Sequence, residues 1–281
     1  MITCDLRGGL GNQLFQIFAT IAYSFKSKNP FKFLGLKTLG GNGCTLRYTF
    51  WESFLSNLKP FLVSSLPQSH IIKERGFEFN ELPVNDMINK HVVIDGYFQS
   101  YKYFHQYYKA ICGIINVDEA RKNVLNKLGS SAEEFTNTVS LHFRIGDYKK
   151  VLNVHPLATY DYYYRSLTHI KNNSASENLR IMYFCEESDL GDALEKIQHL
   201  VQAFPTFKFV RGNNTLADWE QLLLMSCCHH NIIANSSFSW WGAYFNTHDD
   251  KIVCYPSVWF GPAANLNTRD LCPPEWMRIQ C

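Results

Sequence analysis

The second half of this chain alternates short apolar runs with longer amphipathic segments, and this alternation restricts the folds available to it. Runs of strand length fall at five places, 139–144, 180–185, 207–210, 231–234 and 251–255. Helical spacing of apolar residues by three and four falls at 160–171, 190–203, 216–229 and 237–246. Alternating strands and helices form a parallel sheet covered on both faces. The second half is therefore predicted to be an α/β domain.

The first half opens with a predicted strand at 1–6, a glycine-rich turn at 7–11 and a helix that Asn12 is expected to cap. A second strand is predicted at 92–96, and residues 97–104 lead into a helix ending near residue 109. A further helix is predicted at 117–128. Residues 29–90 are expected to form loops and short elements that shape an acceptor groove. The polar segment 130–138 is interpreted as the interdomain linker, so the predicted domains are 1–138 and 139–281.

Composition excludes several classes of protein. The 281 residues are enough for one large or two modest domains, and a net charge of +2 argues against a nucleic-acid binder. The nine cysteines are scattered without the paired spacing of a metal site, which favours a reducing compartment. The N-terminus resembles no signal peptide, and no apolar run approaches the ~20 residues of a membrane span. We therefore expect a soluble or cytoplasmic protein, membrane-associated only if an anchor precedes this chain.

The segment HFRIGDY, residues 142–148, places an arginine where a predicted strand ends. Ligands of open α/β sheets lie at the carboxyl ends of strands, so Arg144 is expected to project into a ligand crevice. A guanidinium group there suits a phosphate. Gly146 permits a sharp turn, and Asp147 follows it. The alternative is a surface ion pair between Arg144 and Asp147, which would contribute little.

A second candidate anion site lies where the strand at 231–234 meets a predicted helix. Asn235, Ser236 and Ser237 stand at this junction. Free N–H groups and the positive end of the helix dipole favour an anion there. The Ser237 hydroxyl group and Arg144 are expected to share a diphosphate. The alternative is an ordinary N-cap serine, with the Trp240–Trp241 pair either in the core or, for at least one ring, between domains or near a sugar.

Five segments resemble, in order, the signatures of the α-1,2-fucosyltransferase family (glycosyltransferase family 11): GGLGNQLFQ, GYFQSYKYF, HFRIGDY, ADWEQLLLMS and NSSFSWWGA. The resemblance implies inverting transfer of L-fucose from GDP-β-L-fucose to the 2-hydroxyl of a terminal β-galactoside. It also implies a GT-B fold, in which two Rossmann-like domains face across a cleft. The N-terminal domain would then take the acceptor and the C-terminal domain GDP-fucose. The family usually carries a second arginine where this chain has Ile145, which predicts weaker donor binding.

The resemblance also implies roles for single residues. Donor binding is expected from Gly9, Gly11, Asn12, His142, Arg144, Asp218, Asn235, Ser236 and Ser237. Asp218 would accept from the two adjacent donors of guanine, although an acid in a helix's first turn is also a routine dipole partner. His142 would touch the ribose or the base, or be a structural histidine. The acceptor is expected near Tyr97 and Gln99, with Glu52 and Tyr103 as further guesses.

Arg144 and Asp147 are the predicted catalytic residues. Arg144 would stabilise the leaving diphosphate. Asp147 would either deprotonate the acceptor hydroxyl or hold Arg144, and an oxocarbenium-like transition state can also proceed without a dedicated base. The chain contains no DxD-type motif, so we expect no metal and no cofactor beyond the co-substrate. The acidic segment 186–189 is interpreted as a solvated loop.

Other functions remain open at this stage. A catalytically idle GDP-sugar or glycan-binding module would share the fold. So would a fucosyltransferase with a different acceptor or linkage. A nicotinamide-dependent oxidoreductase is disfavoured because Leu14 stands where the dinucleotide fingerprint needs a third glycine. A serine hydrolase is disfavoured because the serines at 237–239 lack a G-x-S-x-G elbow.

Overall fold

The computed structural model describes residues 1–40, 45–84 and 90–281, which fold into two compact units. The first unit comprises Met1–Ala120 and Leu266–Pro273, and the second comprises Arg121–Asn265 and Pro274–Cys281. The chain changes unit for the first time within helix α3 (Val117–Leu128). From the sequence, the domain boundary was predicted between residues 138 and 139, and the return of residues 266–273 to the first unit was not predicted. The division of donor and acceptor roles between the units stays a prediction.

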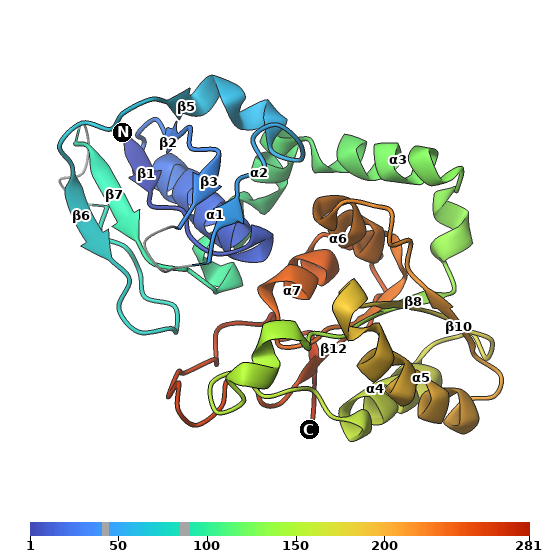
Figure 1. The fold of residues 1–281 in the computed structure, drawn as a ribbon. Coiled ribbons are helices and arrows are strands. Elements are labelled where there is room, and N and C mark those ends of the chain that lie inside the picture. Colours follow the sequence, from blue (N-terminus) through green and yellow to red (C-terminus); the bar gives the residue numbers. More distant parts are fainter. Residues whose placement is uncertain (41–44, 85–89) are drawn as a thin grey trace. The chain divides into compact units, whose positions relative to one another are not determined.

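The first unit is built on a three-stranded parallel sheet in the order β1 (Ile2–Cys4), β7 (Val92–Asp95), β6 (His70–Lys73). Helix α1 (Leu10–Lys26) packs against β1, and its residues are buried on almost every side (Figure 1). Two short ladders complete the unit, and they pair β2 (Phe33–Leu34) with β5 (Leu62–Val63) and β3 (Thr38–Leu39) with β4 (Arg47–Tyr48). A 3-10 helix, η1 (Ser56–Phe61), precedes β5. This agrees with the loops and short elements expected for 29–90, of which 41–44 and 85–89 lie outside the described residues.

Two local predictions for this unit are wrong. Helix α1 begins at Leu10 with Gly9 as its N-cap, so Asn12 lies in the first turn and does not cap the helix. The helix expected to end near residue 109 instead starts there. Two 3-10 turns, η2 (Tyr101–Tyr103) and η3 (His105–Tyr107), lead into α2 (Tyr108–Ile115). Phe98 has a left-handed backbone with φ of 52°, which starts this irregular approach and which sequence periodicity does not reveal.

The second unit contains a six-stranded, wholly parallel sheet in the order β10-β9-β8-β11-β12-β13. Its strands are β8 (Thr138–His142), β9 (Arg180–Phe184), β10 (Lys208–Arg211), β11 (His230–Ile232), β12 (Val253–Pro256) and β13 (Met277–Ile279). The connecting helices are α4 (Tyr160–Asn173), α5 (Leu190–Ala203), α6 (Asp218–Cys227) and α7 (Ser237–Tyr244). The predicted α/β class, with a parallel sheet in each unit taken by itself, is confirmed. Strand β13 was not predicted.

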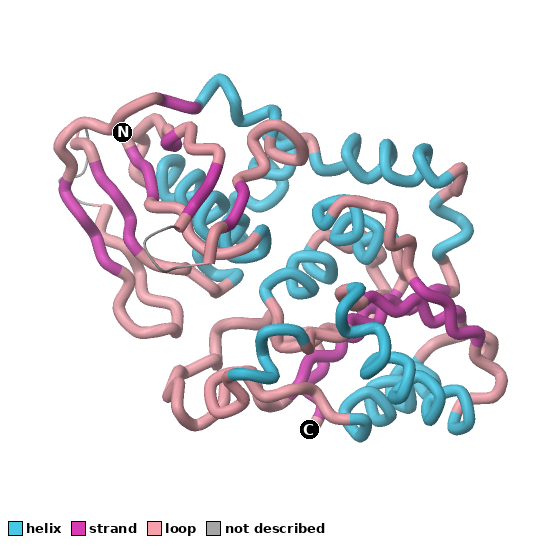
Figure 2. Tube along the Cα trace, in the orientation of Figure 1, coloured by secondary structure: helices cyan, strands magenta, loops and turns pink. Residues whose placement is uncertain are grey.

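Helices cover both faces of this sheet, with α4 and α5 on one face and α6 and α7 on the other (Figures 1 and 2). This arrangement follows from the strand order. The chain moves outward from β8 through β9 to β10, and α6 then carries it back to β11 on the other side of β8. Right-handed crossovers in opposite directions place their helices on opposite faces. The topological switch point, where such sheets bind ligands, therefore lies between β8 and β11.

Two segments around β8 differ from their predictions. The segment 130–138, interpreted as the interdomain linker, lies within the second unit, and a 3-10 helix, η4 (Ala132–Phe135), forms there. Its capping box joins Ser131 and Glu134, and the Ser131 N–H group donates to the Glu134 carboxylate over 2.9 Å. Strand β8 ends at His142, so Arg144 follows the strand rather than ending it. A second 3-10 segment, η5 (Gly146–Lys150), begins at the predicted glycine turn, where Gly146 has φ of 28°.

Two further properties concern the whole described chain. None of the helices in residues 1–40, 45–84 and 90–281 is both long and apolar enough to cross a bilayer. The cysteines in these same ranges are thiols rather than disulfides, and Cys4, Cys228 and Cys254 are buried. Burial raises the pKa of the Cys4 thiol to about 12, which makes it an unreactive core residue.

Ile145 belongs to the core of the second unit. Its side chain is 4% exposed and joins a cluster that includes Val139 and Leu141 of β8 and Tyr163 of α4. The position that usually carries the family's second arginine is thus an apolar packing position in this chain. An arginine built here would have to bury its charge or displace the loop after β8.

We therefore predict that Ile145→Arg lowers the free energy of unfolding by at least about 3 kcal/mol, because a charge in an apolar cluster has no partner there. Urea denaturation of the purified protein measures this change. Ile145→Leu serves as the volume-matched control and should cost less than about 1.5 kcal/mol. An Ile145→Arg protein as stable as wild type would show that side chain 145 reaches solvent without strain.

Candidate active site

Arg144 is the central cation of the switch point. It follows β8, its side chain is 18% exposed, and its guanidinium forms ion pairs with Asp147 and Glu186. The guanidinium also lies over the ring of Tyr148, with its central carbon 4.7 Å from the ring centroid. Burial opposes the positive charge, but the carboxylate of Asp147, together with Tyr148 and Glu186, outweighs it and raises the pKa of Arg144. Arg144 is therefore a permanent, largely buried cation at a strand end.

The acidic segment after β9 helps to hold the Arg144 loop. Glu186 pairs with Arg144, and the carboxylate of Asp189 accepts from the Gly146 N–H group over 2.6 Å. Asp189, in η6 (Glu187–Asp189), is buried. The prediction of a solvated loop agrees with the exposed side chain of Glu186 and is wrong for the buried Asp189. Sequence reasoning missed their role, and the only available signal was a cluster of acids directly after a strand that neighbours β8.

Asn235 links the loops that follow β8 and β11. Its main-chain oxygen accepts from the Tyr148 hydroxyl group over 3.1 Å. Its side-chain Nδ2 donates to the oxygens of Pro156 and Trp259, at 2.9 and 3.0 Å. The buried Oδ1 atom has no hydrogen-bond partner among the described residues. The amide nitrogen of Asn235 is therefore committed to the protein, and only Oδ1 remains for the predicted donor-binding role.

Helix α7 begins at the predicted serines. Ser236 is the N-cap, and its hydroxyl oxygen accepts from the Phe238 N–H group over 3.3 Å. The ordinary capping role therefore falls on Ser236, while Ser237 is half-buried in the first turn. Trp240 and Trp241 are fully buried, and Trp240 stacks on Tyr244 with ring centroids 4.6 Å apart. The tryptophan pair thus packs into the core beneath this helix start.

His142 is a neutral histidine at the end of β8. Its side chain is 8% exposed, and its ring centroid lies 5.7 Å from that of Phe238. Burial, assisted by the charge of Arg144, lowers its pKa to about 3. The buried Nδ1 atom has no hydrogen-bond partner among the described residues. His142 therefore offers the site an uncharged ring, which suits a hydrogen bond and not a charge contact with phosphate.

Asp218 is the first residue of α6, and its side chain is exposed. The buried Glu220, not Asp218, caps this helix, since its Oε2 atom accepts from the Ala217 N–H group over 2.8 Å. Glu220 also pairs with Lys127 at 2.8 Å. Glu220, rather than Asp218, is therefore the residue that caps the start of α6. The guanine contact proposed for Asp218 stays a prediction, and α6 begins after β10 at the same edge of the sheet as the Arg144 loop.

The glycine loop of the first unit is held by glutamines that the sequence reading did not single out. Gln16 exchanges two hydrogen bonds with the main chain of Arg7, at 2.9 and 3.0 Å. Gln13 donates to the oxygens of Gly8 and Tyr48, at 3.0 and 2.9 Å. Gly8 has φ of 79°, and an added Cβ would lie 2.5 Å from Asn12 Nδ2. Both glutamines are fully buried, on a helix face that they share with the buried Thr20 and Ser24. Buried polar groups need partners, and the main chain of Arg7, Gly8 and Tyr48 supplies most of them; Gln13 Oε1 has none among the described residues.

The residues guessed for the acceptor differ in accessibility. Tyr97 is exposed, and the Arg7 guanidinium lies 5.7 Å from its ring centroid. Gln99 is buried and donates to Asn12 Oδ1 over 2.8 Å, so it joins the GYFQ segment to the glycine loop. Glu52 forms an exposed ion pair with Lys59. Tyr103 accepts from the Asn80 N–H group, and burial raises the pKa of its hydroxyl group to about 12.

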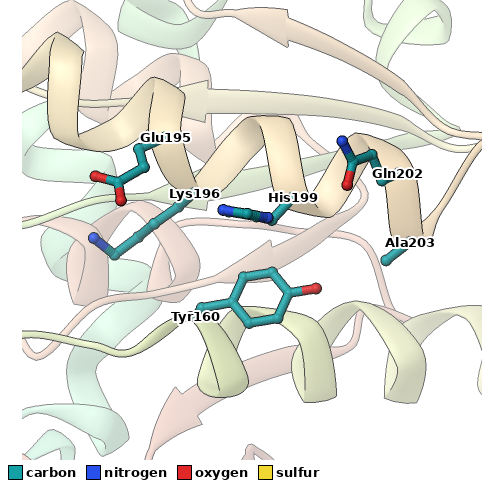
Figure 3. A pocket seen from close by; sticks show the side chains of 6 residues that line it. All are labelled: Tyr160, Glu195, Lys196, His199, Gln202 and Ala203. Atoms are coloured by element: carbon teal, nitrogen blue, oxygen red, sulfur yellow. The ribbon is translucent and has the colours of Figure 1, made fainter.

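A cavity of about 650 Å³ lies elsewhere in the second unit, between α4 and α5. It is lined by Tyr160, Glu195, Lys196, His199, Gln202 and Ala203 (Figure 3). The rings of Tyr160 and His199 meet edge to face, with centroids 5.9 Å apart. None of the predicted site residues lines this cavity, and we do not assign it to the candidate site.

A permanent arginine and a capped helix start lie at the switch point of a parallel sheet in an α/β protein, and this arrangement suits an anionic group. Glycosyltransferases that use sugar nucleotides need such a site. The family model described as Glycosyl transferase family 11 matches residues 52–280. This match spans most of the chain, and the chain therefore belongs to glycosyl transferase family 11.

Two curated relatives come from Escherichia coli. One is named Alpha-1,2-colitosyltransferase and is 29% identical over 301 aligned residues, covering 100% of this chain and 99% of the relative. The other is named O-antigen biosynthesis glycosyltransferase WbnK and is 29% identical over 189 residues, covering 65% of this chain and 59% of the relative.

Solved structures give more distant likenesses. One is a mutant of Arabidopsis thaliana FUT1 in complex with GDP, with 9% identity, a TM-score of 0.48, and coverage of 97% of this chain and 74% of that one. Another is NodZ α-1,6-fucosyltransferase soaked with GDP-fucose, with 12% identity, a TM-score of 0.45, and coverage of 86% and 91%. The assignment of the fold class to this chain rests on its own sheets and helices.

The burial of His142 predicts a pH dependence of stability. The folded state keeps residue 142 neutral down to about pH 3, whereas the unfolded chain binds a proton near the usual pKa of 6.5. The unfolded state is thus favoured as pH falls through this window, by up to about 1.4 kcal/mol per pH unit. His142→Phe keeps a ring and removes the titration. We predict that its stability relative to wild type improves by about 2 kcal/mol between pH 7 and pH 5.

Urea denaturation at several pH values measures this difference. Replacement of the exposed His70 by phenylalanine is the matched control and should follow the wild-type pH dependence. Parallel curves for wild type and His142→Phe would contradict a buried, neutral His142.

Proposed function

We propose that this member of glycosyl transferase family 11 is an inverting galactoside α-1,2-fucosyltransferase that uses GDP-β-L-fucose. The observation that carries the proposal is Arg144, a permanent cation after β8 in a loop that a hydrogen bond from Tyr148 joins to Asn235, just before α7. A diphosphate matches this pair of features, because the guanidinium donates in a fixed plane and the helix start contributes N–H groups. The α-1,2 linkage is supported by the family and by the name of the E. coli relative that aligns with the whole chain.

In the proposed reaction, the acceptor hydroxyl group attacks C1 of fucose while GDP leaves from the opposite face. The C1–O bond to phosphate breaks, its electron pair stays on the diphosphate, and the hydroxyl proton is released. Arg144 would stabilise the charge that grows on the leaving group, and loss of one such donor typically costs roughly 10²–10³ in rate. The ion pair between Asp147 and Arg144 supports a holding role for Asp147. An oxocarbenium-like transition state then requires no dedicated base.

The proposed acceptor is a galactose-terminated oligosaccharide or glycoconjugate. Tyr97 supports an acceptor role for the first unit, since an exposed aromatic ring flanked by a guanidinium suits a sugar face. The proposed reaction uses no metal and no additional cofactor, because Arg144 and the helix N–H groups supply the positive charge that a cation would otherwise bring.

A second sugar nucleotide is an alternative donor and is included in the assay. The relative that aligns with the whole chain is named for colitose transfer, which favours GDP-colitose as the alternative sugar nucleotide. The catalytically idle GDP-sugar-binding module is the third alternative. These three differ in what they release: fucosylated product, colitosylated product, or no product with nucleotide still bound.

We predict that purified protein, incubated with GDP-fucose and lactose in EDTA, releases GDP and forms a fucosylated product. Arg144→Ala should reduce the rate by at least about 10²-fold, because it removes the fixed donor at the leaving group. Product analysis by mass spectrometry and coupled GDP detection provide the two readouts. Arg165→Ala, which removes an exposed arginine of α4, is the matched control and should retain wild-type activity.

Each other result points to a different conclusion. Transfer from GDP-colitose but not GDP-fucose would replace the donor and keep the site. GDP bound tightly with no product from either donor would favour the idle module. Activity lost in EDTA and restored by a divalent cation would overturn the metal-free mechanism, and an Arg144→Ala protein with full activity would remove Arg144 from the site.

A further inference from the structure

The ring of Tyr148 lies between two other planar groups. The central carbon of the Arg144 guanidinium is 4.7 Å from its centroid, and the ring of His155 is stacked on it with centroids 4.4 Å apart and planes inclined by 16°. Phe260 then contacts His155, with centroids 5.4 Å apart. Burial lowers the pKa of His155, so the ring behind Tyr148 is neutral. The Arg144 cation thus lies on one face of the Tyr148 ring, and the uncharged His155 ring lies on the other. A neutral ring on the far face does not repel the cation, which favours the cation–π contact.

The Tyr148 ring is also fixed at its far end. Its hydroxyl group donates to the main-chain oxygen of Asn235 over 3.1 Å. The Asn235 side chain in turn donates to the oxygens of Pro156 and Trp259. Pro156 directly follows His155, and Trp259 directly precedes Phe260. The stack is therefore tied together by hydrogen bonds at its edges, and all its members belong to the second unit.

The carboxylate partners of Arg144 are less suited to fix its plane. The side chains of Asp147 and Glu186 are 59% and 60% exposed, and exposed ion pairs are weak and mobile. Both groups are anions, so an incoming diphosphate competes with them for the same N–H groups. The ring of Tyr148 is neutral, and the central carbon of the guanidinium lies over the face of that ring. Because the ring carries no charge, it does not compete with a diphosphate as an anion, and the contact can persist when phosphate binds.

We propose that Tyr148 is a positioning residue for the transfer reaction, which fixes the plane of the Arg144 guanidinium while its N–H edge holds the leaving diphosphate. The proposal rests on the proposed function, since it needs a leaving group at Arg144. The proposed role requires no contact between Tyr148 and the substrate. Its effect passes through Arg144, and a kinetic test must show that dependence.

Tyr148→Leu removes the ring, and Tyr148→Phe keeps the ring but removes the hydroxyl group. A cation–π contact in a desolvated place contributes about 1–2 kcal/mol, so we expect kcat of Tyr148→Leu to fall roughly 5–30-fold. KM for GDP-fucose should change less than kcat, because the lost interaction strengthens as charge develops on the leaving group. Tyr148→Phe should stay within a few-fold of wild type. Equal kcat in Tyr148→Leu and wild type would overturn the proposal.

A double-mutant cycle tests whether the effect passes through Arg144. Arg144→Lys keeps the charge but loses the planar group that stacks on the ring. If Tyr148 acts only through that plane, adding Tyr148→Leu to Arg144→Lys costs little further activity. A fully additive loss of kcat in the double variant would show that Tyr148 acts independently of Arg144 and would overturn the proposal.

Two controls separate positioning from folding and from the proposed function. Tyr164→Leu removes an exposed tyrosine of α4 and should leave kcat unchanged. Should Tyr148→Leu fail to fold, His155→Leu replaces it, because this variant removes the backing ring and leaves Tyr148 in place; a wild-type kcat there overturns the proposal. If the wild-type protein neither transfers a sugar nor binds GDP, the proposed function is wrong. If the wild-type protein transfers a sugar and Tyr148→Leu has the same kcat, only the positioning role is wrong.

Discussion

The structure of the second unit depends on keeping one guanidinium charged in a largely buried place. A buried cation without partners is costly, and this cost is what the loop after β8 is arranged to offset. Asp147 comes from the same turn, Glu186 comes from the loop after β9, and both pair with Arg144. Asp189 then holds the Gly146 N–H group, which lets the backbone turn at a positive φ directly after the arginine. The conformation of the whole turn thus follows from the requirement to present Arg144.

The location of this cation follows from the order of the strands. Because the chain leaves β8 toward β9 and later returns to its other side at β11, the loops after β8 and β11 have no crossover helix between them. Parallel sheets open at such a point, and two loop segments far apart in sequence meet there. The hydrogen bond from Tyr148 to Asn235 joins these segments across 87 positions of the chain. The start of α7 and Arg144 are in this way brought to the same edge of the sheet, although they are far apart in the sequence.

Local pattern predicted most of the second unit, because its strands are short apolar or alternating segments and α4 and α5 each have a clear apolar stripe. Arg144, Gly146 and the start of α7 were found for the same reason, since strand ends and glycine turns are readable over a few residues. Glu186 and Asp189 were not, because their role depends on β9 lying next to β8, and strand order is not encoded locally. The roles of Gln13 and Gln16 were missed for a different reason. They are polar residues on a buried helix, and their partners lie in the preceding loop and, for Gln13, also at the distant Tyr48.

Ile145 shows how a family pattern and a physical position can diverge. The family pattern predicts that residue 145 is a missing arginine, either a phosphate ligand or a structural residue, whereas the structure places Ile145 in the core beside β8. Successive residues after a strand point to opposite sides, so a chain that presents Arg144 at the sheet edge turns residue 145 inward. In this chain Arg144 has no second arginine beside it at position 145. The precision with which that guanidinium is held then matters more for the proposed transfer, and this gives the Tyr148 ring a functional weight that a pair of adjacent arginines would have shared.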